Sequence, residues 1–325
     1  MLKEDPSQIQ LWAETEAELN DFLDNLSGGA LRFGIALASV GKRGTKRPVG
    51  DSYLQGVFYV YDLQNRVVKH EKVTAPNQLI DLVQWQCPDL IFTRNDMVLL
   101  SVETTTHVLA YDNVAQRILR PIRATLFGVP SIIFQKYDAN DKTYVSWFAE
   151  AFRRNSIINK TPSCAILFTD DSYEEARKDL IEMVNARVFE EDTFETMCNR
   201  YIKENSSRFP FNERLFSSGA RGHGRNWLRI DRDKVTVVVG AKPNAKTWHS
   251  KGTGSMDPYP GLVKMAELLS CYDSDCNRIR ASVETHFRYL PRDFWWFVKY
   301  PNELYYKIIK EISNNVTYAG ERTFA

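Results

Sequence analysis

The chain has 325 residues, of which 43% are hydrophobic and 12% aromatic, so its composition excludes a disordered protein and allows one extended domain or two. Its net charge of +1 gives no bulk indication of a nucleic-acid partner. No apolar run approaches the roughly 20 residues of a membrane span, and residues 1–19 lack the features of a signal peptide. The five scattered cysteines suit free thiols in a reducing compartment. We therefore expect a cytoplasmic protein with no membrane contact.

The first half of the chain alternates helical and strand-like patterns. In order, we predict an amphipathic helix over 8–26, a strand pair over 56–73, a short helix over 75–86, a hairpin over 87–107, a helix over 111–130 that is kinked by Pro121 and stopped at Gly128, and a buried strand over 131–136. This order predicts an α/β fold with a central mixed β-sheet flanked by helices.

The second half of the chain is harder to interpret and predicts an α+β C-terminal extension. The patterns indicate a strand and helix over 164–189, a strand over 234–242, a helix after the Gly/Pro-rich turn in 254–272, and an aromatic, partly helical segment over 293–312. We place a domain boundary near 155–162. The expected units are residues 1–158 and residues 159–325, with one continuous fold as the alternative.

Two carboxylates lie at the ends of the predicted hairpin. Asp89 opens its first strand and Glu103 ends its second, on either side of a tight turn at Asn95-Asp96. Antiparallel pairing about this turn brings the two carboxylates together at one edge of the sheet. Hard oxygen ligands at fixed spacing suit a divalent cation, which can activate water and neutralise a phosphate. Pairing with Arg117 or Arg120 would also compensate a buried Glu103.

At these residues the chain resembles the PD-(D/E)XK nuclease superfamily, which includes most type II restriction endonucleases. The resemblance covers about residues 75–136 and rests on Pro88-Asp89, the hairpin, Glu103-Thr104-Thr105, and the following helix and strand. It implies a restriction-endonuclease-like core in which Asp89 and Glu103 bind Mg²⁺, with Mn²⁺ as a substitute. It also implies that Thr105 occupies the position usually filled by a lysine.

The threonine leaves three explanations open. Thr105 can hydrogen-bond the attacking water, or a cation can come from elsewhere, with Lys136 at the end of the next strand as the leading candidate. In the third explanation the protein has lost catalysis and only binds nucleic acid.

Other side chains are candidates for the same site. In the resembling family an acidic residue of the first helix often approaches the metal, which makes Glu18 a candidate third ligand, although it also suits a solvated helix face. His107 is a candidate proton shuttle on the strand face of Glu103, or a structural residue. Arg117, on the basic side of the next helix, is a candidate contact for the scissile phosphate.

Two basic, Gly-containing stretches are candidate DNA contacts, because phosphate binding needs cations on backbone that can approach closely. The first is residues 41–51 and the second residues 211–234, and either could be a solvated loop instead. The residues selected from them are Lys42, Arg43, Lys46, Arg47, Arg221 and Arg225.

The expected function is a Mg²⁺-dependent endonuclease that cuts double-stranded DNA at specific sites, as a homodimer without a small-molecule cofactor. The alternatives are a non-specific defence or repair nuclease of the same superfamily, and a silent nucleic-acid-binding protein on the same scaffold. A further alternative is an unrelated α/β protein in which the hairpin carboxylates pair with arginines.

Overall fold

The structure is a computed structural model of the chain. It describes residues 9–13, 16–26, 35–39, 57–62, 68–72, 75–83, 88–107, 117–139, 143–189, 192–211, 216–218, 226–230, 234–239, 265, 268–269, 282–287 and 316–318. None of the helices in these ranges is long and apolar enough to cross a membrane.

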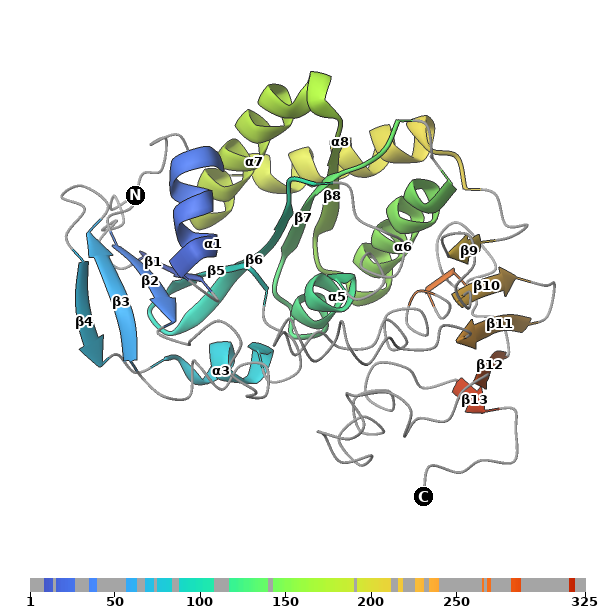
Figure 1. The fold of residues 1–325 in the computed structure, drawn as a ribbon, viewed down its shortest axis with the longest axis horizontal. Helices are drawn as coiled ribbons and strands as arrows, with labels where there is room; N and C mark the ends of the chain where they lie inside the picture. The colour runs from blue at the N-terminus through green and yellow to red at the C-terminus, as the bar shows by residue number, and fades with distance from the viewer. Residues whose placement is uncertain are drawn as a thin grey trace, which may run out of the picture.

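A mixed sheet of eight strands forms the centre of the fold (Figure 1). Its strands are β1 (Ile9–Ala13), β2 (Ile35–Ser39), β3 (Val57–Asp62), β4 (Val68–Lys72), β5 (Leu90–Arg94), β6 (Met97–Thr105), β7 (Ser131–Lys136) and β8 (Ser163–Phe168). They are ordered β4-β3-β2-β1-β5-β6-β7-β8. β1 and β2 are parallel, as are β6, β7 and β8, and the other neighbouring pairs are antiparallel.

A second mixed sheet comes from the C-terminal half of the chain. Its strands are β9 (Phe216–Ser218), β10 (Asn226–Ile230), β11 (Lys234–Val239), β12 (Ser282–Phe287) and β13 (Val316–Tyr318), ordered β13-β12-β11-β10-β9. β9, β10 and β11 pair antiparallel, whereas β11, β12 and β13 pair in parallel.

Helices cover both faces of the eight-stranded sheet. They are α1 (Glu16–Asp21) with the π-helical turn η2 (Phe22–Leu26), α3 (Asn77–Val83), α5 (Leu119–Leu126), α6 (Thr143–Asn159), the 3-10 turn η3 (Asp170–Ser172), α7 (Tyr173–Val188) and α8 (Thr193–Arg208). The core on one face is built with residues of α1, η2, α7 and α8, and the cores on the other face with residues of α3, α5 and α6 (Figure 1). This is an α/β architecture with a mixed sheet.

Strand alternation at the end of β6 assigns Val102 and Glu103 to opposite faces of the sheet. Val102 packs in the core with α1 and α7, so its neighbour Glu103 points to the face covered by α5 and α6. The register partner of Glu103 in β7 is Ile133, which belongs to the core under α5 and α6. The acidic residue of β6 is therefore buried on the α5 face of the sheet.

The prediction of one helix over 8–26 is wrong in its first part. Residues 9–13 form β1, an interior strand that pairs with β2 on one side and β5 on the other. Ile9 and Leu11 are buried on one face of this strand and Trp12 on the other, so the run is apolar on both sides. The apolar spacing also fits a helical period, and long-range pairing decides in favour of the strand.

The hairpin and the elements around it are confirmed. β5 and β6 pair antiparallel across Asn95 and Asp96, whose φ values of 46° and 67° are those of a tight two-residue hairpin turn. The strand pair β3–β4, the short helix α3, the buried strand β7, the succession of β8 and α7, and the strand β11 are also found where predicted.

The helix predicted over 111–130 is described from residue 117, and α5 begins at Leu119. Pro121 lies in the first turn of α5, where a missing N–H costs nothing, so no kink is needed. The helix ends before Gly128, which has the left-handed φ of 70° that favours glycine, as predicted.

The sheet continues across the boundary that was predicted at residue 158. β8 begins at Ser163 and pairs in parallel with β7, and α8 packs against β8 as far as Asn205, whose Nδ2 donates to the Ala165 carbonyl at 2.7 Å. Residues up to Arg208 therefore belong to the same sheet-centred unit as the hairpin.

Candidate active site

The hairpin places its two carboxylates side by side. Leu90 pairs with Val102, so the next positions outward, Asp89 and Glu103, face one another at the end of the strand pair. Both residues are buried. The sequence prediction that these carboxylates meet at one edge of the hairpin is confirmed.

Asp89 is held in place by the strand opposite. Its Oδ2 accepts a hydrogen bond from the backbone N–H of Thr104 at 2.8 Å and another from the Thr104 hydroxyl at 3.1 Å. These bonds occupy one carboxylate oxygen and fix the plane of the group. The other oxygen, Oδ1, lies 3.1 Å from Nη1 of Arg120.

Two arginines three residues apart neutralise the carboxylate pair. Arg120 Nη1 lies 2.5 Å from Oε1 and 2.7 Å from Oε2 of Glu103. Arg117 Nη1 donates to Glu103 Oε1 at 2.8 Å and lies 3.9 Å from Asp89 Oδ2. Arg120 lies in the first turn of α5 and Arg117 lies just before the N-cap residue Ile118, and both guanidinium groups reach the same pair.

Arg117 is also tied to the strand that carries Glu103. The same Nη1 donates to the hydroxyl of Thr105 at 2.7 Å and to the backbone carbonyl of Thr104 at 3.1 Å. Thr105, at the position where the resembling family usually has lysine, is therefore bonded to Arg117, which lies two residues before α5. The positive charge next to the carboxylates comes from arginine side chains.

The electrostatic cost of this arrangement falls on Glu103. Its side chain is 1% exposed, whereas those of Arg117 and Arg120 are 25% and 22% exposed. Burial raises the pKa of the Glu103 carboxyl and the charge of Asp89 adds to the rise, while the two arginines act in the opposite direction. The arginines thus offset only part of the desolvation of Glu103.

Two of the predicted site residues lie away from this cluster. Lys136 follows Gln135, the register partner of Thr105, so it points to the opposite face of the sheet, where its Nζ pairs with Asp170 at 2.6 Å. Glu18 lies in α1, which packs on that opposite face through Leu19. The structure brings neither residue to the carboxylates, because strand parity and helix placement assign both to the α1–α7 face.

His107 lies two residues past the end of β6 and is exposed, so it does not continue the buried row of Glu103 and Thr105. The six candidate DNA contacts in the basic stretches lie outside the described residues; they are Lys42, Arg43, Lys46, Arg47, Arg221 and Arg225.

Sequence reasoning missed the position of Gln135 beside Thr105. Its side chain is buried, and its Nε2 donates to the carbonyl of Lys136 at 2.6 Å, while Oε1 has no hydrogen-bond partner among the described residues. The signal in the sequence was a polar residue in an otherwise apolar buried strand, since such a group needs a partner.

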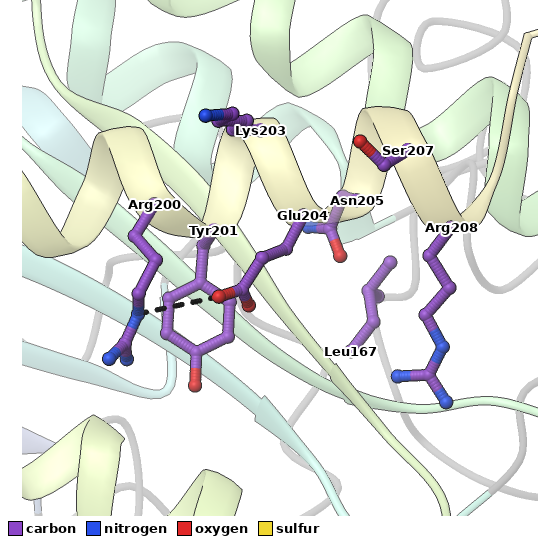
Figure 2. Close-up of a pocket in the computed structure, with 8 residues that line it drawn as sticks. All are labelled: Leu167, Arg200, Tyr201, Lys203, Glu204, Asn205, Ser207 and Arg208. Carbon is purple, nitrogen blue, oxygen red and sulfur yellow. Dashed lines mark ion pairs between the residues drawn. The ribbon is translucent and has the colours of Figure 1, made fainter.

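A pocket lies along α8, two strands away from the carboxylates (Figure 2). Leu167 in this pocket is the register partner of Gln135, which in turn pairs with Thr105. The lining residues are Leu167, Arg200, Tyr201, Lys203, Glu204, Asn205, Ser207 and Arg208.

Part of the pocket wall is a fixed ion-pair network. Asp179 accepts from the Tyr201 hydroxyl and from Arg200, each at 2.5 Å, and Arg200 also lies 3.8 Å from Glu204. Burial and the bond to Asp179 raise the pKa of Tyr201, so the phenol stays protonated at neutral pH. Arg200 and Tyr201 therefore serve as pocket structure.

Two carboxylates suit a divalent cation by their chemistry. Mg²⁺ is commonly held by one or two carboxylates, with substrate phosphates and water as its remaining ligands. Within the described parts of the chain, no group of three or more His, Cys, Asp and Glu side chains is placed to hold a metal. Asp89 and Glu103 are two carboxylates whose oxygens converge on one position, the Arg120 Nη1 nitrogen.

Comparisons with known proteins give no relative for this chain: no family model, no curated protein and no solved structure matches it.

Proposed function

We propose that the protein is a Mg²⁺-dependent endonuclease that hydrolyses phosphodiester bonds of double-stranded DNA, with a restriction-endonuclease-like core over its first sheet. The observation that carries the proposal is the position of Asp89 and Glu103 side by side at the end of the β5–β6 hairpin. Three of their oxygens lie within 3.1 Å of one cationic nitrogen, Nη1 of Arg120. Carboxylates on paired strands form a cation site whose spacing the sheet fixes.

In this function Asp89 and Glu103 would hold the metal, which supplies charge neutralisation at the phosphate and activation of water. Thr104 orients Asp89 through its two hydrogen bonds. Arg117, held by Thr105, presents a guanidinium whose charge and fork of donors match a phosphate. Arg117, just before α5, would thereby supply the positive charge that a lysine at position 105 supplies in the resembling family.

The nucleic-acid partner is supported by the distribution of cations. Arg117 and Arg120 lie at the carboxylates, and Lys203 and Arg208 border the pocket on α8, where Leu167 is in register with Gln135 and Gln135 with Thr105. A phosphodiester chain carries one charge per nucleotide, so it suits several separate cations better than a small anion does. Site-specific cutting of duplex DNA would favour a homodimer.

A specific observation favours a second candidate, a nucleic-acid-binding protein that does not cleave. Both carboxylates already have guanidinium partners within 3.1 Å, and Thr105 stands where a lysine is expected. A silent binder would keep this charge balance permanently and would retain DNA in a salt-sensitive manner.

Digestion of plasmid and phage DNA with Mg²⁺ separates the two candidates. We expect the wild-type chain to produce discrete fragments, and Asp89→Ala and Glu103→Ala each to abolish them, because one carboxylate alone would hold the metal poorly. A smear in place of fragments would favour a non-specific nuclease. Salt-sensitive DNA binding without cleavage, with either Mg²⁺ or Mn²⁺, would favour the silent binder.

A further inference from the structure

The contact between Arg120 and the carboxylates is unusual in its geometry. An arginine commonly meets a carboxylate with two nitrogens in a fork, one for each oxygen. Here the single atom Nη1 lies within 3.1 Å of Asp89 Oδ1 and of both oxygens of Glu103. An NH₂ group has two hydrogens for these three acceptors. At least one of the three oxygens is therefore held mainly by electrostatic attraction to the positively charged guanidinium.

That position cannot be shared with a metal ion. Mg²⁺ is bound by oxygens at about 2.0–2.1 Å, and the three oxygens already surround the nitrogen at 2.5–3.1 Å. An ion coordinated by the same oxygens would lie on or next to Nη1. Arg120 and a metal at these carboxylates therefore exclude one another.

The charge balance leads to the same conclusion. Two carboxylates and two guanidinium groups sum to zero, so a divalent cation added to the intact cluster would leave two uncompensated positive charges beside the buried Glu103. Withdrawal of one arginine removes half of this excess. A phosphate from the substrate can supply the rest.

Arg120 is the arginine suited to withdraw. Arg117 donates to the Thr104 carbonyl and to the Thr105 hydroxyl, and these bonds persist when Glu103 turns to another partner. Arg120 has the central position among the carboxylate oxygens, which is the position a metal would take, and its side chain is partly exposed, as that of Arg117 is.

We propose that Arg120 is the resident cation of the metal-free site: it holds Asp89 and Glu103 together until a divalent metal displaces it, and it thereby sets the metal affinity of the site. This rests on the metal-dependent part of the proposed function and not on DNA as the substrate.

The test is Mn²⁺ binding by isothermal titration to the full chain, without DNA. We expect Arg120→Ala to bind one Mn²⁺ at least about tenfold more tightly than the wild type, because the competing charge is gone. Guanidinium chloride, below denaturing concentrations, should compete with Mn²⁺ in Arg120→Ala, since it can refill the vacated position. Arg123→Ala is the matched control, because Arg123 lies on the same helix but stacks over Phe127 and donates to the Asp81 carbonyl.

Each outcome decides the proposal. Unchanged Mn²⁺ affinity in Arg120→Ala, or guanidinium that fails to compete, overturns it. If Arg120→Ala unfolds in the absence of metal, recovery of its melting temperature by Mn²⁺ supports the proposal, and failure to recover contradicts it. Because no DNA is present, a chain that never cleaves DNA can still pass this test, so the two proposals fail separately.

Discussion

Replacing Glu103 by alanine is expected to lower the free energy of unfolding by about 3 kcal/mol, at the low end of the range for breaking a buried ion pair. The carboxylate is 1% exposed and receives both arginines, so its removal leaves two guanidinium charges beside the single carboxylate of Asp89. Their partial exposure to water keeps the loss at the lower end of that range. Chemical denaturation of the wild type and the variant measures the difference.

A double substitution shows whether the loss comes from the excess positive charge that Glu103 no longer balances. Glu103→Leu with Arg120→Leu removes a charge of each sign and leaves Asp89 with Arg117, so we expect it to be more stable than Glu103→Leu alone. Glu174→Ala is the surface control, because its pair with Arg177 has Glu174 68% exposed and is worth less than about 1 kcal/mol. A double variant that is no more stable than the single one would mean that packing, and not charge, causes the loss.

The raised pKa of Glu103 shows that the ionised carboxylate itself is costly to bury. Because the folded-state pKa lies above the unfolded one, the folded chain takes up a proton at this carboxyl more readily than the unfolded chain does. The ionised form therefore opposes folding increasingly as the pH rises through the raised pKa. The buried pair as a whole adds little net stability at neutral pH, although removal of one partner is costly.

Under the proposed endonuclease function, Asp89→Asn is expected to lower the cleavage rate at least about a hundredfold, whereas Lys136→Ala is expected to stay within about threefold of the wild type. Asp89 touches the cation position through Oδ1, and an amide is a weaker and neutral ligand. Lys136 pairs with the exposed carboxylate of Asp170 on the other face of the sheet. Single-turnover cleavage of one plasmid substrate measures both variants.

Thr105→Ala completes the comparison. It removes the acceptor that holds Arg117 but leaves both carboxylates in place, so an intermediate loss of rate is expected. Inactive Lys136→Ala with normal Thr105→Ala would show that the missing cation is supplied by Lys136, contrary to the geometry of the site.

The hairpin could be predicted because its determinants are local. Asn95-Asp96 favours the tight turn and the flanking apolar residues favour strands, so the approach of the two strand ends follows from the sequence. Plain counting outward from Arg94 and Met97 would pair Asp89 with Val102, and the register shift between Phe92 and Thr93 places Asp89 opposite Glu103 instead. Arg117 and Arg120 were recognisable as possible partners because they follow on the next predicted helix. Their simultaneous contact with Glu103 depends on where α5 packs, which no local pattern specifies.

The wrong predictions for Lys136, Glu18 and residues 9–13 share one cause. The face of the sheet on which a side chain lies depends on pairing with strands that are distant in the sequence. Whether Lys136 or Gln135 lies beside Thr105 depends on the parallel register of β6 and β7, which a shift of one residue reverses. Residues 9–13 carry an apolar run that fits a helix or an interior strand, and only the neighbours β2 and β5 select the strand. The placement of Glu18 on the opposite face follows from the same misassigned segment.

The most direct test of a metal between Asp89 and Glu103 is iron-mediated cutting of the chain itself. Fe²⁺ with ascorbate and peroxide in place of Mg²⁺ produces radicals at the bound ion, and mass spectrometry of the fragments locates it. We predict scission beside residues 89 and 103, suppressed by excess Mg²⁺ and absent from the Asp89→Asn/Glu103→Gln double variant. Scission elsewhere, or a pattern that the double variant leaves unchanged, would contradict a metal site at this hairpin.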